Sequence, residues 1–213
     1  MGGGTPLFEA NRVGANVVGF DINPMSRWVV QQELAALDVD AFREAANNIL
    51  EKTAKEIGDL YKTDCQRCSN LADVKYFLWV KTTTCTECGH SIRLFNNYRV
   101  AKNERHPNHV IACAACGDLN EVASQEAIPD TTCRSCESRL QYDGPARRRY
   151  CTCPKCGTDN DPRSEEGLPN HELYAIEYHC PVCYSEVTGR QFKAPDDNDS
   201  ALLEEAKSRL KGV

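Results

Sequence analysis

Hydrophobic positions in the first quarter of the chain predict a helix followed by a strand. Thr5 suits a helix N-cap, Pro6 suits the first helical position, and Gly14 suits the helix end. Residues 17–22 then form a nearly continuous apolar run that contains one acid, Asp21. A run of this kind is typical of a strand buried on both faces.

Residues 25–62 show the spacing of amphipathic helices. The apolar positions are Trp28, Val29, Leu34, Leu37, Phe42, Ile49, Leu50, Ile57 and Leu60. The segment Asp38–Asp40 breaks this pattern, so we expect two helices, the second capped at Asp40. Their apolar faces are expected to pack on a sheet, with binding to a partner as the alternative.

Strand patterns dominate the middle of the chain, at residues 74–81 and 174–179. The aromatic residues Tyr76, Phe77 and Trp79 favour core packing, and stacking on nucleic-acid bases is the alternative. Residues 195–200 are predicted to be an acidic linker, and residues 200–210 a short amphipathic helix that begins a further domain.

Cysteine spacing changes this picture most. Twelve of the thirteen cysteines form six Cys-x-x-Cys pairs: Cys65/Cys68, Cys85/Cys88, Cys113/Cys116, Cys133/Cys136, Cys153/Cys156 and Cys180/Cys183. Two such pairs complete a tetrahedral shell of four sulfurs for Zn²⁺, so the sequence predicts three zinc sites. Gly89, Gly117 and Gly157 follow three pairs and allow a tight turn there. Cys151 is left as a spare thiol, with exchange against Cys153 at the metal as the alternative.

Three other readings of these cysteines are weaker. A disulfide scaffold fits poorly, because no apolar signal peptide precedes the region and adjacent pairs make a poor disulfide framework. Six redox dithiols in one domain would be unusual. Iron–sulfur sites also use four thiolates but often show a denser run of cysteines.

The pairing of the six motifs is open from sequence. Strand-like residues between Cys88 and Cys113, and between Cys136 and Cys153, favour one ribbon from the second and third pairs and another from the fourth and fifth. The first and sixth pairs would then close the outside of the module. The alternative is sequential pairing, first with second, third with fourth and fifth with sixth.

Charge and composition limit the partners. The formal charge is −6, and twelve thiolates with three Zn²⁺ would take it to about −12, so contact with nucleic acid must be local. The run Arg147–Arg149 is the best candidate for phosphate contact, and a solvated hairpin is the alternative. No run of eighteen apolar residues occurs, so we expect no membrane span and a cytoplasmic location.

A glycine-rich loop, a helix and a strand with an acid near its end also predict half of a nucleotide-binding Rossmann-like sheet. The glycines let the backbone approach a ligand, and Asp21 would accept hydrogen bonds from ribose hydroxyls. The alternative is a glycine-rich tail, a short helix and an ordinary core strand.

The same residues resemble the S-adenosylmethionine motif of amino-group DNA methyltransferases. The zinc segment is similar to one subfamily, the adenine-specific DNA methylases that contain a zinc ribbon. The matching stretches are residues 1–5, 9–10, 14 and 18–24 for the cofactor motif, and 75–82, 85–90, 176–183 and 189–195 for the zinc segment. The resemblance implies that Gly2, Gly3, Gly4 and Thr5 line the methionine side of S-adenosylmethionine, that Asp21 binds its ribose, and that DNA is a partner.

Two departures from that family shape the expected organisation. The catalytic Asp-Pro-Pro-Tyr motif does not occur, and the chain begins at the glycine loop without the strand that precedes it in the family. No catalytic residue is therefore predicted, and we expect an N-terminal portion, inactive and weak in cofactor binding by itself. It is either a split enzyme completed by a second polypeptide or a truncated remnant. A non-catalytic zinc module that binds nucleic acid or protein is the alternative function.

The fold class follows as α/β, a partial Rossmann-like fragment followed by a small, mainly β zinc-ribbon module. The expected segments are residues 1–62 for cofactor binding, 63–194 for the zinc module, and 195–213 for the linker and helix.

Overall fold

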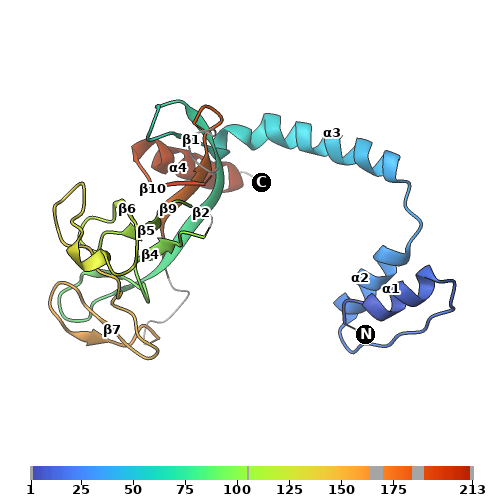
Figure 1. Cartoon of the computed structure of the whole chain (residues 1–213), viewed down its shortest axis with the longest axis horizontal. Coiled ribbons are helices and arrows are strands. Elements are labelled where there is room, and N and C mark those ends of the chain that lie inside the picture. The colour runs from blue at the N-terminus through green and yellow to red at the C-terminus, as the bar shows by residue number, and fades with distance from the viewer. Residues whose placement is uncertain (1, 105, 164–169, 184–189, 212–213) are drawn as a thin grey trace. The chain divides into compact units, whose positions relative to one another are not determined.

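The computed structural model describes residues 2–104, 106–163, 170–183 and 190–211. They form two compact units, residues 1–56 and 57–213 (Figure 1). The described part is mixed α/β with small antiparallel sheets, and the Rossmann-like sheet stays a prediction. Among the described residues, no helix has the length and apolar character needed to cross a membrane.

The first unit consists of helices. They are α1 (Thr5–Arg12), α2 (Pro24–Leu34) and α3 (Val39–Ile57), the last ending at the unit boundary. Gly4, with a φ of 82°, is the N-cap of α1, one residue before the predicted cap. Gly14 follows the end of α1 at a φ of 85°, as predicted.

The predicted break between the next two helices is confirmed, but the cap differs. The side chain of Asp38, not Asp40, accepts hydrogen bonds from the backbone of Asp40 (3.1 Å) and Ala41 (3.0 Å). The apolar side chains Trp28, Phe42 and Ile49 are exposed. No sheet covers these side chains in the described part of the first unit, so the predicted packing on a sheet is met only at the end of the segment, where the half-buried Ile57 and Leu60 line one hollow with the strand residues Phe77 and Trp79.

The predicted buried strand at residues 17–22 is also wrong in this structure. The segment has no strand assignment, and Val18 and Phe20 are 80% and 84% exposed. A strand requires a hydrogen-bonded neighbour, which the described part of the first unit does not offer.

The second unit holds all described strands. It consists of the 3₁₀ helices η1 (Gly58–Tyr61) and η2 (Ile128–Asp130), the strands β1 (Lys62–Asp64), β2 (Leu71–Thr84), β3 (Ser91–Arg93), β4 (Arg99–Ala101), β5 (His109–Ala112), β6 (Leu119–Val122), β7 (Cys151–Thr152), β8 (Asp159–Asn160), β9 (Asn170–His179) and β10 (Gln191–Lys193), and the helix α4 (Asp197–Lys211). The strands form a sheet ordered β1-β2-β9-β10 with β3 beside β2, a sheet β4-β5-β6, and the pair β7-β8.

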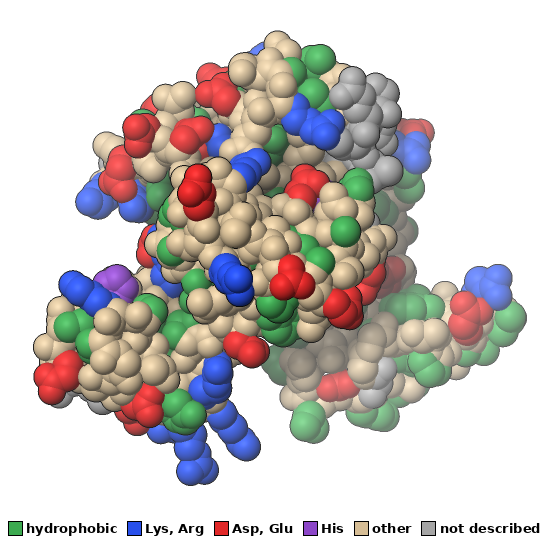
Figure 2. Space-filling view, turned by 60° about the vertical axis from the view of Figure 1, so that its left-hand side comes forward, with side chains coloured by type: hydrophobic (Ala, Val, Ile, Leu, Met, Phe, Trp, Pro, Cys, Tyr) green, Lys and Arg blue, Asp and Glu red, His purple; other side chains and the backbone are tan. Residues whose placement is uncertain are grey.

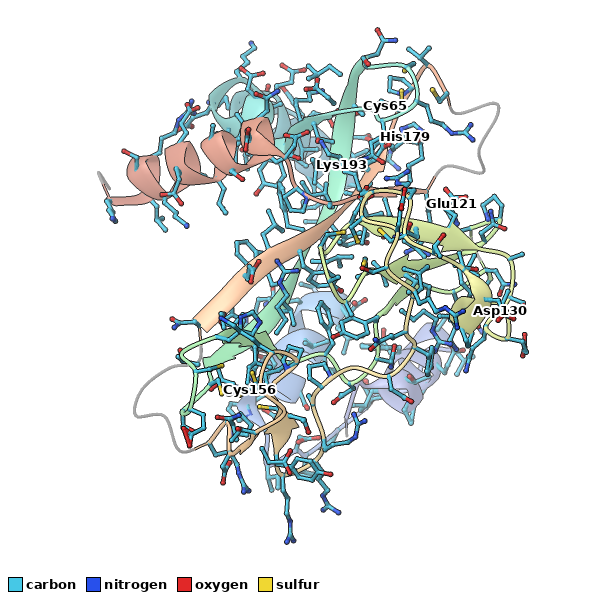
Figure 3. The ribbon with its side chains drawn as sticks, turned by 90° about the vertical axis from the view of Figure 1, so that its left-hand side faces the viewer. Cys65, Glu121, Asp130, Cys156, His179 and Lys193 are labelled. Carbon is cyan, nitrogen blue, oxygen red and sulfur yellow. The ribbon has the colours of Figure 1, made fainter. Side chains whose placement is uncertain are left out.

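The antiparallel pair β2–β9 organises this unit. β2 has fourteen residues, so it extends for roughly 45 Å at about 3.3 Å per residue. Its register places Asp73 opposite His179 and Thr82 opposite Asn170. In Figure 3, Cys65 and Cys156 lie at opposite ends of this pair. Two shifts of register, at Val74/Tyr76 and Leu78/Trp79, interrupt the alternation of inward and outward side chains.

The aromatic residues of β2 lie at or between these shifts of register and differ in exposure. Tyr76 and Trp79 are exposed, whereas Phe77 is half-buried and contacts the ring of Tyr61 at 6.0 Å between centroids. Core packing, the favoured prediction, therefore holds for Phe77 alone.

The described residues form three separate hydrophobic clusters, and each contains cysteines. The first lies around Ile111 and Leu140 and includes Cys113 and Cys133. The second includes Cys65, Cys180 and Cys183, and the third includes Cys85, Cys151 and Cys153. Each cluster thus surrounds a different set of sulfurs, as expected of units that metal binding holds together.

The predicted acidic linker is instead an ordered cap for α4. Asp199 Oδ2 accepts from the backbone N–H of Asp196, and Asp196 Oδ1 accepts from that of Asp199, both at 3.0 Å. This reciprocal arrangement is a capping box. The buried Lys193 Nζ lies 2.5 Å from Asp196 Oδ2 and 2.9 Å from Asp199 Oδ2, and also donates to Thr63 Oγ1 at 2.9 Å. These contacts hold the start of α4 against the sheet.

Candidate metal centres and cofactor loop

The twelve paired cysteines gather into three tetrads whose sulfurs lie within 4.8 Å of one another. We name them by their nesting in the sequence: the outer tetrad is Cys65, Cys68, Cys180 and Cys183, the middle tetrad is Cys85, Cys88, Cys153 and Cys156, and the inner tetrad is Cys113, Cys116, Cys133 and Cys136. Each combines two Cys-x-x-Cys motifs, so the three tetrads use all six.

The distances between sulfurs fit a tetrahedral metal ion. Sulfurs from different motifs lie 3.6 Å apart at Cys68/Cys180, Cys85/Cys156 and Cys113/Cys136. A tetrahedron with metal–sulfur bonds of about 2.3 Å has edges of about 3.8 Å, the geometry of a four-cysteine zinc site. A disulfide needs about 2.05 Å between sulfurs, and all thirteen cysteines are free. The tetrads could therefore hold metal ions, consistent with zinc.

The structure corrects the predicted pairing. Closure of the first pair with the sixth is confirmed, because the register of β2 with β9 brings Cys65 and Cys180 to one end of the sheet. The two inner ribbons were wrong: Cys85/Cys88 joins Cys153/Cys156, and Cys113/Cys116 joins Cys133/Cys136. The sequential alternative is right only for this last combination. The six motifs are therefore nested concentrically.

A common hairpin presents at least five of the six motifs. Strand or bridge partners lie seven residues apart around each: 64 with 71, 84 with 91, 112 with 119, 132 with 139, and 152 with 159. The residue after the second cysteine is left-handed, as predicted for Gly89, Gly117 and Gly157. Ser69 and Glu137 adopt the same conformation with φ values of 55° and 59°. The residues that follow Cys183 lie outside the described part.

A buried asparagine connects the two motifs of the middle tetrad. Asn160 Oδ1 accepts a hydrogen bond from the backbone N–H of Thr86 at 2.8 Å, and its Nδ2 donates to Cys85 Sγ at 3.7 Å. Asn160 lies four residues after Cys156, so it reaches across the tetrad to the other motif.

The inner tetrad repeats this arrangement. Asn120 lies four residues after Cys116, accepts from the backbone N–H of Arg134 at 2.9 Å and donates to Cys133 Sγ at 3.5 Å. Donors of this kind stabilise thiolate ligands and orient them toward a metal.

Tyr178 has the corresponding position in the outer tetrad. Its hydroxyl accepts from the backbone N–H of Gln66 at 3.2 Å and lies 3.9 Å from Cys65 Sγ. Gln66, Thr86 and Arg134 each follow the first cysteine of a motif. These partners were not predicted from the sequence, although the repeated spacing Cys-Gly-x-x-Asn marks two of them.

Thiols within one tetrad differ in acidity. Hydrogen bonds from the Ser138 side chain and backbone lower the pKa of Cys136 to about 6, and burial raises the pKa of Cys116 to about 12. Without metal, some thiols of a tetrad therefore keep their protons at neutral pH. A metal ion that binds all four sulfurs releases those protons, so its affinity depends on pH.

Cys151 lies outside the tetrads. It is fully buried on β7, in the cluster that contains Cys85, Ile92 and Cys153. This agrees with its prediction as a spare thiol that packs in the interior.

The glycine loop and the predicted ribose acid lie together in the first unit. Asp21 Oδ2 accepts from the backbone N–H of Gly2 at 2.7 Å, and Oδ1 accepts from that of Asn23 at 2.8 Å. The bonds from Asn23 and Gly2 lower the pKa of Asp21 to about 2, so the exposed carboxylate is charged. A hollow of about 390 Å³ adjoins it, lined in part by Leu7 and Phe20.

The other loop residues differ in their surroundings. A Cβ on Gly4 would lie 2.4 Å from Val30 Cγ2, and its φ of 82° also favours glycine. Gly3 has open space around it, and Thr5 is the first residue of α1. Gly4 therefore has a packing role, while Gly2, Gly3 and Thr5 stay accessible.

Comparison with protein-family models, with curated proteins and with solved structures finds no match for this chain.

Proposed function

We propose that this chain is part of an S-adenosylmethionine-dependent DNA methyltransferase that acts on the amino group of adenine. The first unit binds one side of the cofactor, and the second unit holds three Zn²⁺ ions. The observation that carries the cofactor proposal is the contact between Gly2 and Asp21, which joins the two parts of the predicted motif at 2.7 Å.

The roles of the loop residues follow from their chemistry. Gly2, Gly3 and Thr5 offer accessible backbone to the methionine end of the cofactor, and Asp21 offers a charged acceptor to ribose hydroxyls. The hollow beside Leu7 and Phe20 provides an apolar surface for a planar base. When bound, S-adenosylmethionine supplies the methyl group.

The chain offers no Asp-Pro-Pro-Tyr motif to hold the target amine and stack on the flipped base. In this proposal that motif lies outside these 213 residues. So does the strand against which residues 17–22, with the exposed Val18 and Phe20, become buried.

The three zinc ions have a structural role in this proposal. Four thiolates fill the tetrahedral shell, which leaves no position for water or substrate. At least two cysteines of every tetrad also belong to a hydrophobic cluster, so metal binding and folding of the second unit are coupled.

Titration with S-adenosylmethionine, followed by NMR of the isotopically labelled zinc-loaded chain, tests the cofactor proposal. We expect weak binding, with shifts confined to residues 3–5 and 20–22, and loss of these shifts in Asp21→Asn. Asp40→Asn, at another exposed acid of the first unit, is the matched control and should behave as the wild type. Equal shifts in wild type and Asp21→Asn at millimolar cofactor, or none in either, would contradict the proposal.

A second candidate is a non-catalytic zinc module that binds nucleic acid. It is favoured by the concentration of all three tetrads and the exposed Arg147–Arg149 run in the second unit. This candidate predicts DNA binding without any cofactor-dependent shift, so the same titration separates the two.

A further inference from the structure

A short arginine-rich hairpin projects beside the middle tetrad. Its stem is closed by the bridge between Ala146 and Cys151 and by the hydrogen bond from Thr152 N to Pro145 O at 3.0 Å. At the tip, Arg147 N donates to Tyr150 O at 2.7 Å, which makes a tight turn of Arg147 to Tyr150. We name these four residues the arginine turn.

The base of this hairpin is fixed to its surroundings. Gly144 N donates to Asn96 O at 3.1 Å, and Ala146 N donates to Phe95 O at 3.0 Å. A Cβ on Gly144 would lie 2.0 Å from Phe95 O, so the backbones are in close contact. β7 then leads directly into the motif Cys153/Cys156. The arginine turn is therefore presented by an ordered base rather than by a loose loop.

The positive charge of this turn is not neutralised within the described part of the chain. Arg147 donates to two neutral carbonyls, Gly144 O at 2.6 Å and Ala146 O at 3.0 Å. Arg148 and Arg149 are exposed, and the described residues place no carboxylate within ion-pair distance of either. Tyr150 beside them is 44% exposed.

Most other cations of the second unit have acidic partners. Ion pairs join Lys62 to Asp73, Arg134 to Asp118, Arg163 to Asp161, Arg190 to Glu177 and Lys207 to Glu204. In a chain of net charge −6, three successive arginines without such partners form a local concentration of positive charge. Figure 2 shows Lys and Arg side chains projecting together from the lower edge of one face.

We propose that the arginine turn contacts the sugar–phosphate backbone of duplex DNA. This inference rests on the proposed DNA-directed function and names the surface that would use it. Guanidinium groups bind phosphate oxygens through two parallel hydrogen bonds, and a tyrosine hydroxyl also donates to phosphate. Contacts of this kind position a protein on DNA without reading its sequence.

The test is fluorescence anisotropy of a labelled duplex DNA with the zinc-loaded full chain at several salt concentrations. The variant Arg147→Gln/Arg148→Gln/Arg149→Gln should bind the duplex at least about tenfold more weakly at low salt. Its plot of log affinity against log salt concentration should become shallower, the slope being less negative by up to about 3. The triple Arg→Lys variant keeps the charge and should retain most of the affinity. Lys52→Gln/Lys55→Gln/Lys75→Gln removes the same charge from exposed positions elsewhere and should bind as the wild type.

Zinc content is measured on every variant, because the arginines also lie near the middle tetrad. Weaker binding only together with loss of zinc would overturn the inference, as would equal binding by the wild type and the glutamine variant. Equal binding would leave the methyltransferase proposal standing, with DNA held elsewhere. If the wild type does not bind duplex DNA at low salt, or binds duplex RNA in preference, both the inference and the DNA-directed function fail.

Discussion

Asn160 follows the Cys153/Cys156 motif by four residues, yet its amide donates to the sulfur of Cys85, in the other motif of the middle tetrad, across 3.7 Å. The same amide accepts from the backbone N–H of Thr86 at 2.8 Å. One buried side chain thus fixes the first motif of the middle tetrad, Cys85/Cys88, and offers a donor to the Cys85 thiolate. Asn120 repeats both contacts in the inner tetrad, so the arrangement is a recurring part of these sites.

Substitution Asn160→Ala should weaken zinc binding at the middle tetrad by roughly 10- to 100-fold, the usual effect of losing a partner of a metal ligand. The reason is the loss of the donor to Cys85 and the unpaired N–H left at Thr86. Competition with a chromophoric chelator measures this, with Asn16→Ala, at an exposed position, as the control. If Asn160→Ala transfers zinc to the chelator in the same way as the wild type, the contact does not stabilise zinc binding.

Concentric nesting of the motifs makes a prediction for paired substitutions. Cys85→Ser with Cys153→Ser removes two ligands of one tetrad and should cost one zinc ion. Cys85→Ser with Cys113→Ser affects two tetrads and should cost two. The zinc content of the two purified double variants is the measurement. Loss of two ions in the first variant and one in the second would contradict the nested pairing and support the pairing predicted from sequence. Cys65→Ser with Cys180→Ser should again cost only one ion.

Lys193 should matter far more to stability than an exposed lysine of α4. Its ammonium group is buried between Asp196 and Asp199, and their carboxylates raise its pKa against the opposing effect of burial. Lys193→Met leaves these acids without their cation, which should cost about 3–5 kcal/mol.

Chemical denaturation of the zinc-loaded protein measures this difference. Lys207→Met, which breaks the exposed pair with Glu204, is the control and should cost at most about 1 kcal/mol. Equal losses in both variants would mean that the cluster around Lys193 does not secure α4.

The left-handed residues after five of the six motifs allow a stabilising substitution. Ser69 has a φ of 55°, where a side chain costs roughly 1–2 kcal/mol relative to glycine. Ser69→Gly should therefore raise stability, offset in part by the larger entropy of glycine in the unfolded chain. Gly89→Ala should lower stability by a similar amount, since no atom lies within 4 Å of the added Cβ and only the backbone is strained. Thermal unfolding measures both variants: the midpoint should rise in Ser69→Gly and fall in Gly89→Ala.

The sequence was informative where the chemistry is local. The spacing within each Cys-x-x-Cys motif predicted tetrads, and the glycines after three motifs predicted left-handed turns, because both depend on neighbouring residues. The break at Asp38 and the end of α1 at Gly14 were likewise predictable, because a capping side chain and a left-handed glycine both act within one turn of helix.

The pairing of motifs was not predictable in the same way. Cys65 and Cys183 are 118 residues apart, and their proximity depends on the register of β2 with β9. The burial of Asp199 was not predicted either. An acidic stretch is expected to be solvent-exposed, and the sequence does not reveal that the buried Lys193 pairs with Asp199 in the fold. Residues 17–22 have the composition of a strand, but pairing needs a neighbour that composition does not reveal.

Elemental analysis of protein purified without added metal tests the three four-cysteine zinc sites most directly. The expected result is close to three zinc ions per chain, with little iron. All three should remain after gel filtration and be released when a thiol-specific mercurial titrates the twelve paired cysteines. A value near one zinc per chain, or iron in place of zinc, would contradict it.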